Sequence, residues 1–503
     1  MTEATDVQGA ENPLINADLA PVPPEKRTWR VGSFAALWIS MSACIPTYML
    51  ASSLIGGGMN WWQAILTIFL GNLIVVVPMI LNAHAGTRYG IPFPVFCRAS
   101  FGTVGANVPA MMRALVACGW FGIQCWIGGN ALFTIVRVLV LKFYQQDLAQ
   151  VLPIGWLGIN QWQLLCFLAF WSINMLVVYL GINSIRVLLN IKAPLLIVLG
   201  LVLLGWAYQQ AGGFGPMLAK PSAFDPGQPQ AGKFWAYFFP ALTGMVGFWA
   251  TLSLNIPDFS RYAKTQRDQI LGQALGLPLT MALFAFIGVA VTSATTVIYG
   301  KELWDPIDVL ARFENPTVLI IAMLALCLAT LATNIAANVV SPANDFAHLA
   351  PRWISFRMGG LITGIIGIVI MPWKLLADAN RYIGWLLSYS ALLGPIGGIM
   401  IADYYAYRRR KLDVAGLYDA QGPYRFLNGI SWVAIVAFVG GVLPSLPGFL
   451  VKVNAIPAAS VPAHVEGHWD FAWFVSLFDY AWFVGFGVAF VLYLLLRPLA
   501  PKS

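Results

Sequence analysis

Two tryptophans and two carboxamides lie within long apolar runs of this chain. Trp120 precedes Gln124 by four residues in one run, Trp249 follows two glycines in another, and Asn338 closes a third. An indole offers a flat stacking surface, and a carboxamide offers one acceptor and two donors. On a helix, Trp120 and Gln124 would share one face. Such groups suit a flat, polar, uncharged heterocycle held inside a membrane.

Each of these residues also has a simpler interpretation. The chain has 20 tryptophans, and tryptophan is common at membrane interfaces. Gln124 and Asn338 could instead form hydrogen bonds between helices. The ligand-binding hypothesis therefore rests on the combination of the four residues.

The elements that must position them are membrane-spanning helices. The 503 residues are 59% hydrophobic and 10% charged, far from the usual composition of soluble proteins. Apolar runs of about 20 residues recur along the chain. We predict an all-α polytopic membrane protein with about 12 spans, near residues 31–56, 62–86, 104–141, 160–181, 190–210, 235–257, 270–299, 316–346, 359–373, 380–404, 426–449 and 472–496.

The distribution of positive charge predicts the topology. With residues 1–30 on the cytoplasmic side, 19 of the 29 Lys and Arg residues fall on that side and eight on the other, while Arg113 and Arg137 lie inside the third span. The positive-inside rule then puts both termini, 1–30 and 497–503, in the cytoplasm of a cell with this protein in its plasma or inner membrane. The distribution of the net charge of +8 thus indicates membrane topology. We expect the lipid bilayer as a partner and no nucleic acid.

Two spans carry helix-breaking residues. Pro46 interrupts the first span, and Gly244 and Gly247 precede Trp249 in the sixth. Breaks at corresponding positions of two repeats are typical of transporter binding sites. Proline and glycine also serve ordinary helix packing in membranes, so both interpretations stay open.

Charged residues inside the spans are few. Arg113 lies about two turns before Trp120, and we expect it to pair with Asp258 in a cytoplasmic gate that also includes Tyr389, or in a structural ion pair. The sequence has no Walker A, HExxH or GxSxG motif, so nothing favours an enzyme or a primary pump, and we expect no cofactor.

The chain resembles the nucleobase:cation symporter-1 family, which includes hydantoin, allantoin, cytosine and uracil permeases. The motifs that carry the resemblance extend over nearly the whole chain: Glu25–Trp29, Gly86–Pro94, Arg98–Gly102, Asn255–Phe259, Ala336–Pro342 and Leu393–Gly398.

The resemblance implies a five-plus-five inverted-repeat, LeuT-like fold with discontinuous helices one and six. Residues 31–210 would form the first repeat, 235–404 the second, and 426–496 two further helices. In hydantoin-transporting members, two tryptophans hold the ligand while a glutamine and an asparagine bind its edge; these positions match Trp120, Trp249, Gln124 and Asn338. Asn334 also matches and is expected to shape the pocket.

The resemblance also implies a sodium site, and the chain departs from the family pattern once in this site and once in the substrate pocket. Its candidate positions are Ser40, Ala43, Ala329, Ala332 and Thr333. Ala332 stands where a serine ligand is expected, so the coupling ion is Na⁺ or H⁺. Phe248 stands where a glycine precedes the second tryptophan, which adds a ring to the binding site.

We expect a monomeric secondary transporter that imports a neutral nucleobase, uracil first and allantoin or a hydantoin as the alternative. The run Ser388–Pro395 looks closer to uracil-type members, and Ile45–Tyr48 is shared with allantoin permeases. A channel or a non-transporting receptor on the same scaffold is the alternative of a different class.

Overall fold

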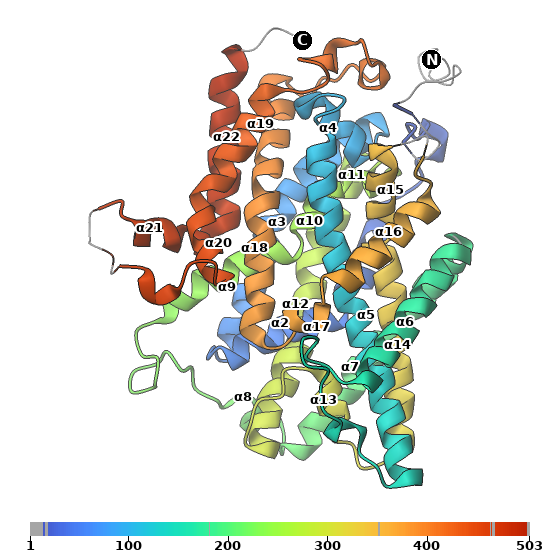
Figure 1. The fold of residues 1–503 in the computed structure, drawn as a ribbon, viewed down its shortest axis with the longest axis vertical. Coiled ribbons are helices and arrows are strands. Elements are labelled where there is room, and N and C mark those ends of the chain that lie inside the picture. Colours follow the sequence, from blue (N-terminus) through green and yellow to red (C-terminus); the bar gives the residue numbers. More distant parts are fainter. Residues whose placement is uncertain are drawn as a thin grey trace.

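Helices form nearly all of the regular structure in this computed structural model (Figure 1). It describes residues 14–15, 19–180, 182–350, 353–462, 464 and 468–499, with the backbone alone for 182–194. The predicted spans correspond to α1 (Val31–Ser42) with α2 (Ile45–Gly56), α3 (Trp61–Tyr89), α5 (Asn107–Tyr144), α6 (Gln161–Leu180), α7 (Ile182–Gln210), α9 (Phe234–Phe248) with α10 (Ala250–Asn255), α12 (Gln266–Tyr299), α14 (Pro316–Asn338) with α15 (Val340–Leu349), α16 (Phe356–Val369), α18 (Ala379–Ile401), α19 (Trp432–Val442) with α20 (Leu446–Lys452), and α22 (Ala481–Leu496).

Within the described residues, eight helical segments are long and apolar enough to cross a membrane, and the bent pair α1–α2 makes a ninth. Three shorter apolar helices, Leu195–Gln210, Phe234–Phe248 and Phe356–Val369, lie where spans five, six and nine are predicted. Short connecting helices include α4 (Phe93–Phe101), α11 (Pro257–Ser260) and α13 (Pro306–Leu310). The predicted all-α polytopic class is confirmed.

The first span breaks where proline was expected to break it. The chain is extended at Cys44 (φ −149°, ψ 157°), and α2 begins with Ile45 and Pro46. Proline fits the first turn of a helix because the N–H that it lacks has no partner there. The two halves meet at an angle of 60°.

The sixth span breaks at Trp249 itself. This residue (φ −105°, ψ 7°) ends α9 and precedes α10. Gly247 allows α9 to approach α18, since a Cβ there would lie 2.2 Å from the Ser390 Oγ. The prediction of discontinuous first and sixth spans is therefore confirmed. An additional break, at Val339 between α14 and α15, was not predicted.

The helices pack in two groups. The bundle group comprises α1, α2, α3, α9, α10 and α12; the scaffold group comprises α5, α6, α14, α15 and α16. Contacts within each group are far more extensive than contacts between them, and α7 packs on both α12 and α14. Gly122 and Gly367 bring α5 against α16, because a Cβ on Gly122 would lie 2.4 Å from the Gly367 carbonyl oxygen. This arrangement allows one group to move as a unit against the other.

A short helix, α13, covers one end of α2 and α5, and Asp305 caps it by accepting a 2.9 Å hydrogen bond from the Ile307 N–H. Burial and the neighbouring Asp308 raise the pKa of Asp305 to about 7. A carboxyl group that binds its proton more tightly in the folded state lowers stability as pH rises from its unfolded pKa of about 4 to its folded pKa.

We expect Asp305→Asn to flatten the pH dependence of stability between about pH 4 and 7, because asparagine keeps the cap acceptor and cannot titrate. The measurement is thermal unfolding in detergent across that range. Asp419→Asn is the control, since Asp419 accepts from the Gln421 N–H at 2.8 Å in an exposed loop. An unaltered profile in Asp305→Asn would contradict the prediction.

Candidate functional site

A small cavity of about 40 Å³ lies where the two helix groups face each other. The scaffold group contributes Trp120, Gln124, Thr333 and Asn338, and the bundle group contributes the residues around both helix breaks. The lining residues are Met41, Cys44, Pro46, Trp120, Gln124, Phe248, Trp249, Thr251, Leu252, Thr333, Ala337 and Asn338. All four residues singled out from the sequence thus line one cavity.

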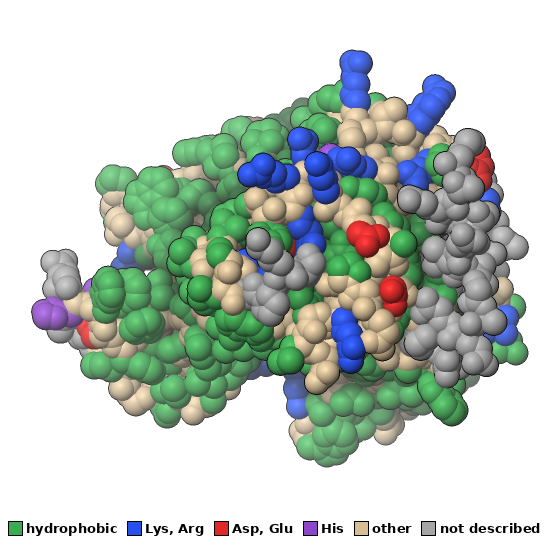
Figure 2. All heavy atoms as spheres, turned by 90° about the horizontal axis from the view of Figure 1, so that it is seen from above, with side chains coloured by type: hydrophobic (Ala, Val, Ile, Leu, Met, Phe, Trp, Pro, Cys, Tyr) green, Lys and Arg blue, Asp and Glu red, His purple; other side chains and the backbone are tan. Residues whose placement is uncertain are grey.

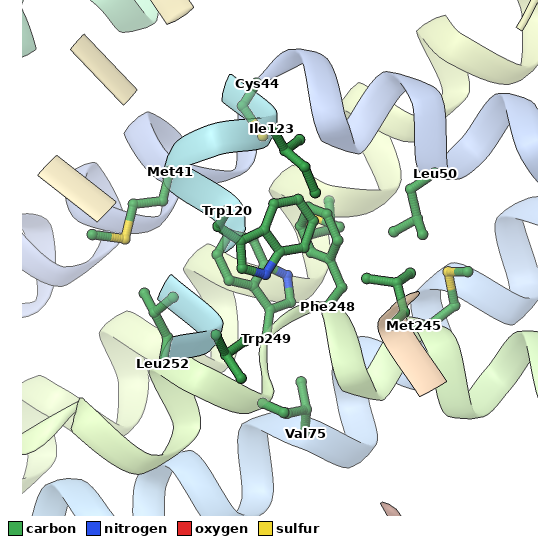
Figure 3. Close-up of a cluster of buried hydrophobic side chains, with 14 of the residues drawn as sticks. Met41, Cys44, Leu50, Val75, Trp120, Ile123, Met245, Phe248, Trp249 and Leu252 are labelled. Carbon is green, nitrogen blue, oxygen red and sulfur yellow. The ribbon is translucent and has the colours of Figure 1, made fainter. Parts of the chain in front are cut away.

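The walls of the cavity are aromatic (Figure 3). Phe248 lies edge-to-face with Trp120 at 5.3 Å between ring centroids and with Trp249 at 5.0 Å. Trp38 packs edge-to-face on Trp249 at 5.3 Å, from the side of α1. Phe248 therefore contacts both tryptophans and narrows the space next to them.

Two polar atoms of the lining are buried without a hydrogen-bond partner in the described structure. They are the Gln124 Oε1, an acceptor, and the Trp249 Nε1, a donor. Leaving a buried polar group unpaired is costly. Other described residues outside the cavity, such as Gln273, also have one, so it is the position of these two atoms in the cavity lining that matters. A ligand that enters the cavity with an N–H and a C=O would satisfy both atoms.

Asn338 and Asn334 lie on one face of α14 and are hydrogen-bonded to each other. The Asn338 Nδ2 donates to the Asn334 Oδ1 at 3.1 Å. Asn334 is fully buried and does not line the cavity. It sits behind Asn338, which agrees with an indirect effect on the pocket.

The five candidate cation positions come from the α1–α2 break and from α14. Ser40 and Ala43 belong to the last turn and the C-terminal cap of α1, and Ala329, Ala332 and Thr333 face inward on α14. Met41, Cys44 and Thr333 line the same cavity, so the break and α14 do meet there. Thr333 donates its hydroxyl to the Ala329 carbonyl at 2.9 Å, and its oxygen keeps lone pairs for a cation.

This oxygen set fits a sodium ion incompletely. Sodium, like other hard cations, is held by several oxygen ligands. The last carbonyls of α1 at the break and the Thr333 hydroxyl supply such ligands, whereas Ala332 supplies no side-chain oxygen. Ser42, which the sequence did not single out, has a buried hydroxyl without a described partner at the same break.

The expected pairing of Arg113 with Asp258 is wrong. Arg113 Nη1 instead contacts Asp345 Oδ2 at 3.2 Å, with both side chains almost fully buried. Asp258 accepts from the Phe93 N–H and from the Ser341 hydroxyl, each at 2.8 Å. The reason is geometric: α15 packs on α5, which places Asp345 beside Arg113.

Asp345 and Asp258 therefore stabilise different contacts, one within a helix group and one between groups. Arg113 and Asp345 both belong to the scaffold group, so their ion pair holds one group together. The bond between Ser341 on α15 and Asp258 on α11 crosses to the end of the sixth span. Tyr389 belongs to neither contact: it packs against Trp120 at 6.4 Å and Trp385 at 5.1 Å.

Comparison with known proteins agrees with this architecture. The family described as permeases for cytosine/purines, uracil, thiamine and allantoin matches residues 21–476. The purine-uracil permease NCS1 of Arabidopsis thaliana is 44% identical over 494 residues, covering 97% of this chain and 79% of that protein. This chain belongs to that family.

The allantoin permease of Bacillus subtilis is another member, 39% identical over 505 residues and covering 99% of this chain and 96% of that protein. Among solved structures, inward-facing Mhp1 matches with a TM-score of 0.76 at 26% identity, covering 98% of this chain and 96% of that chain. Closed Mhp1, a nucleobase-cation-symport-1 family transporter with bromovinylhydantoin bound, matches with a TM-score of 0.75 at 25% identity, covering 97% of each chain. The resemblance inferred from the motifs and the LeuT-like fold class are confirmed, and the chain is a multi-pass permease rather than an enzyme.

Like Ser42, Asn174 lies near the site and was missed from the sequence. Asn174 on α6 is fully buried and accepts from the Asn334 Nδ2 at 3.1 Å. The sequence could have indicated Asn174, because it is an amide near the middle of an apolar run, as Gln124 is.

Proposed function

We propose that this permease imports uracil by cation symport and alternating access, with Trp120, Gln124, Phe248, Trp249 and Asn338 as the substrate-contacting residues. The carrying observation is the cavity between the two helix groups, where an unpaired acceptor and an unpaired donor lie within aromatic walls. Uracil is a flat ring with N–H donors and C=O acceptors at its edge. Allantoin or a hydantoin is the alternative substrate.

The position of the cavity supports a transport cycle. Because its walls come from both groups, a bound ring is released when one group rocks against the other. The Ser341–Asp258 bond joins the groups at the end toward which the C-termini of α10 and α15 point, and we assign it to the cytoplasmic gate. Figure 2 shows many Lys and Arg side chains on the end that carries α4, which favours a cytoplasmic location for that end.

Uptake of labelled uracil in cells without their own uracil transport tests the substrate. Unlabelled uracil should compete best, ahead of allantoin, hydantoins, cytosine and purines. Stronger competition by allantoin would favour the alternative. Counterflow in proteoliposomes separates a transporter from a channel, because a channel shows no trans-acceleration.

The coupling ion is Na⁺ or H⁺, and the same assay separates them. Replacing sodium with choline should abolish uptake if Na⁺ is coupled, which would mean that Ser42 or water completes the oxygen set. Uptake that persists without sodium but collapses with a proton uncoupler would assign H⁺. Uptake insensitive to both would contradict symport.

Phe248 should determine the size of the accepted ring. We expect Phe248→Ala to improve competition by 5-benzylhydantoin relative to uracil by about tenfold or more, because removal of the ring opens space beside both tryptophans. The measurement is the ratio of the two inhibition constants. Phe238→Ala, on the same helix and outside the cavity lining, is the control; an unchanged ratio in Phe248→Ala would show that the added ring does not limit the pocket.

A further inference from the structure

Three buried asparagines connect the cavity to α6 through one chain of hydrogen bonds. Asn338 Nδ2 donates to Asn334 Oδ1 at 3.1 Å, and Asn334 Nδ2 donates to Asn174 Oδ1 at 3.1 Å. Asn174 Nδ2 donates in turn to the Phe170 carbonyl at 2.8 Å. We call Asn174, Asn334 and Asn338 the asparagine relay.

The relay has a fixed direction because it ends on backbone carbonyls. A carbonyl oxygen can only accept, so the NH₂ of Asn174 must face Phe170 and its oxygen must face Asn334. The Phe121 carbonyl, 3.2 Å from the Asn334 Nδ2, fixes the second amide in the same sense. Asn334 then presents its oxygen to the NH₂ of Asn338. This orients the Asn338 oxygen away from Asn334 and leaves it available to a ligand, together with the second N–H of the same amide.

We propose that Asn174 is a positioning residue which, through Asn334, holds Asn338 as a hydrogen-bond acceptor toward the substrate, so that the site selects rings presenting two N–H donors. The second donor meets the unpaired Gln124 Oε1 on the neighbouring helix α5. This inference rests on the proposed function and specifies the ligand edge that the same cavity recognises. Uracil, with N1–H and N3–H, meets the requirement.

The wild-type protein should discriminate against rings that lack one of these donors. Cytosine has an acceptor in place of the N3–H of uracil, and 1-methyluracil lacks the N1–H. Whichever of these two N–H groups faces Asn338, one of the two analogues lacks it. An acceptor or methyl group placed against a buried carbonyl oxygen should weaken binding about tenfold or more. The readout is the inhibition constant of each analogue relative to uracil.

One of the two analogues, cytosine or 1-methyluracil, lacks the donor that faces Asn338. For that analogue, Asn334→Leu should lower the ratio of its inhibition constant to that of uracil by about fivefold or more. The reason is that uracil loses an ordered acceptor that the analogue never used. Asn174→Leu should change this ratio in the same direction as Asn334→Leu. A purely structural role would change uptake of uracil and its analogues in parallel and leave the ratio unchanged.

Asn72→Leu is the matched control. Asn72 on α3 is also fully buried and donates to a carbonyl one turn earlier, Ile68, at 2.7 Å, but it is outside the cavity lining. In Asn72→Leu, the inhibition constant of each analogue relative to that of uracil should equal the wild-type value. An unchanged ratio in Asn334→Leu would overturn the relay, and an unchanged ratio in Asn174→Leu alone would overturn the role of Asn174. A wild-type protein that binds neither uracil nor the analogues would overturn the proposed function and this inference with it.

Discussion

Replacing Gln124 with leucine should raise the KM for uracil uptake roughly 10- to 100-fold while the protein remains at least as stable as the wild type. The two effects have one cause. In the described structure the Gln124 Oε1 is buried without a partner, so removing it relieves an unsatisfied group in the unliganded protein. The same removal leaves a substrate N–H unpaired in the complex.

The measurement pairs uptake kinetics with thermal unfolding in detergent. Gln273→Leu is the matched control, because Gln273 on α12 is also buried with an unpaired Oε1 and does not line the cavity. It should leave KM unchanged. If Gln124→Leu transported uracil with wild-type KM, Gln124 would not contact the substrate.

Replacing Arg113 with leucine should lower the free energy of unfolding by about 3–5 kcal/mol, because it leaves the buried Asp345 carboxylate without its cation. The pair is almost fully excluded from solvent, so solvent does not compensate. Arg113→Leu combined with Asp345→Leu should recover most of the loss, since an apolar pair of similar volume is often as stable as a buried ion pair. The readout is unfolding of the purified protein in detergent.

Arg381→Leu serves as the control, because the Arg381–Asp378 pair is exposed and exposed pairs contribute little. A stable Arg113→Leu protein that has lost uptake, with Asp258→Leu behaving identically, would contradict the structural role. That result would restore the gate pairing expected from the sequence.

The sequence was a good guide where a local chemical rule decides the structure. Pro46 favours the first turn of a helix, and the first span breaks just before it. Proline is not sufficient, since Pro78 and Pro240 lie inside continuous helices. Trp120 and Gln124 share a face because their spacing matches the helical repeat. The family motifs then placed Trp249 and Asn338 with them, and the cavity has all four in its lining.

The sequence was a poor guide where distant helices decide the structure. Nothing in the spacing of the charged residues indicates that Arg113 meets Asp345 rather than Asp258, because this contact depends on how α15 packs on α5. The contact of Phe248 with Trp120 depends on how distant parts of the chain pack, because Trp120 belongs to α5 and Phe248 ends α9, which packs on α3 and α18. The repeat boundaries at 31–210 and 235–404 remain predictions.

Trp249 is both a wall of the cavity and the residue at which the sixth span changes direction. A ligand that touches this indole therefore has different affinities for the different angles between α9 and α10. Substrate binding and the angle between α9 and α10 are then thermodynamically linked. A substitution that favours the angle preferred by the substrate raises substrate affinity, and one that favours another angle lowers it. Substrate affinity can then be tuned by mutations that never contact the substrate, and the backbone on either side of Trp249 is where we expect to find them.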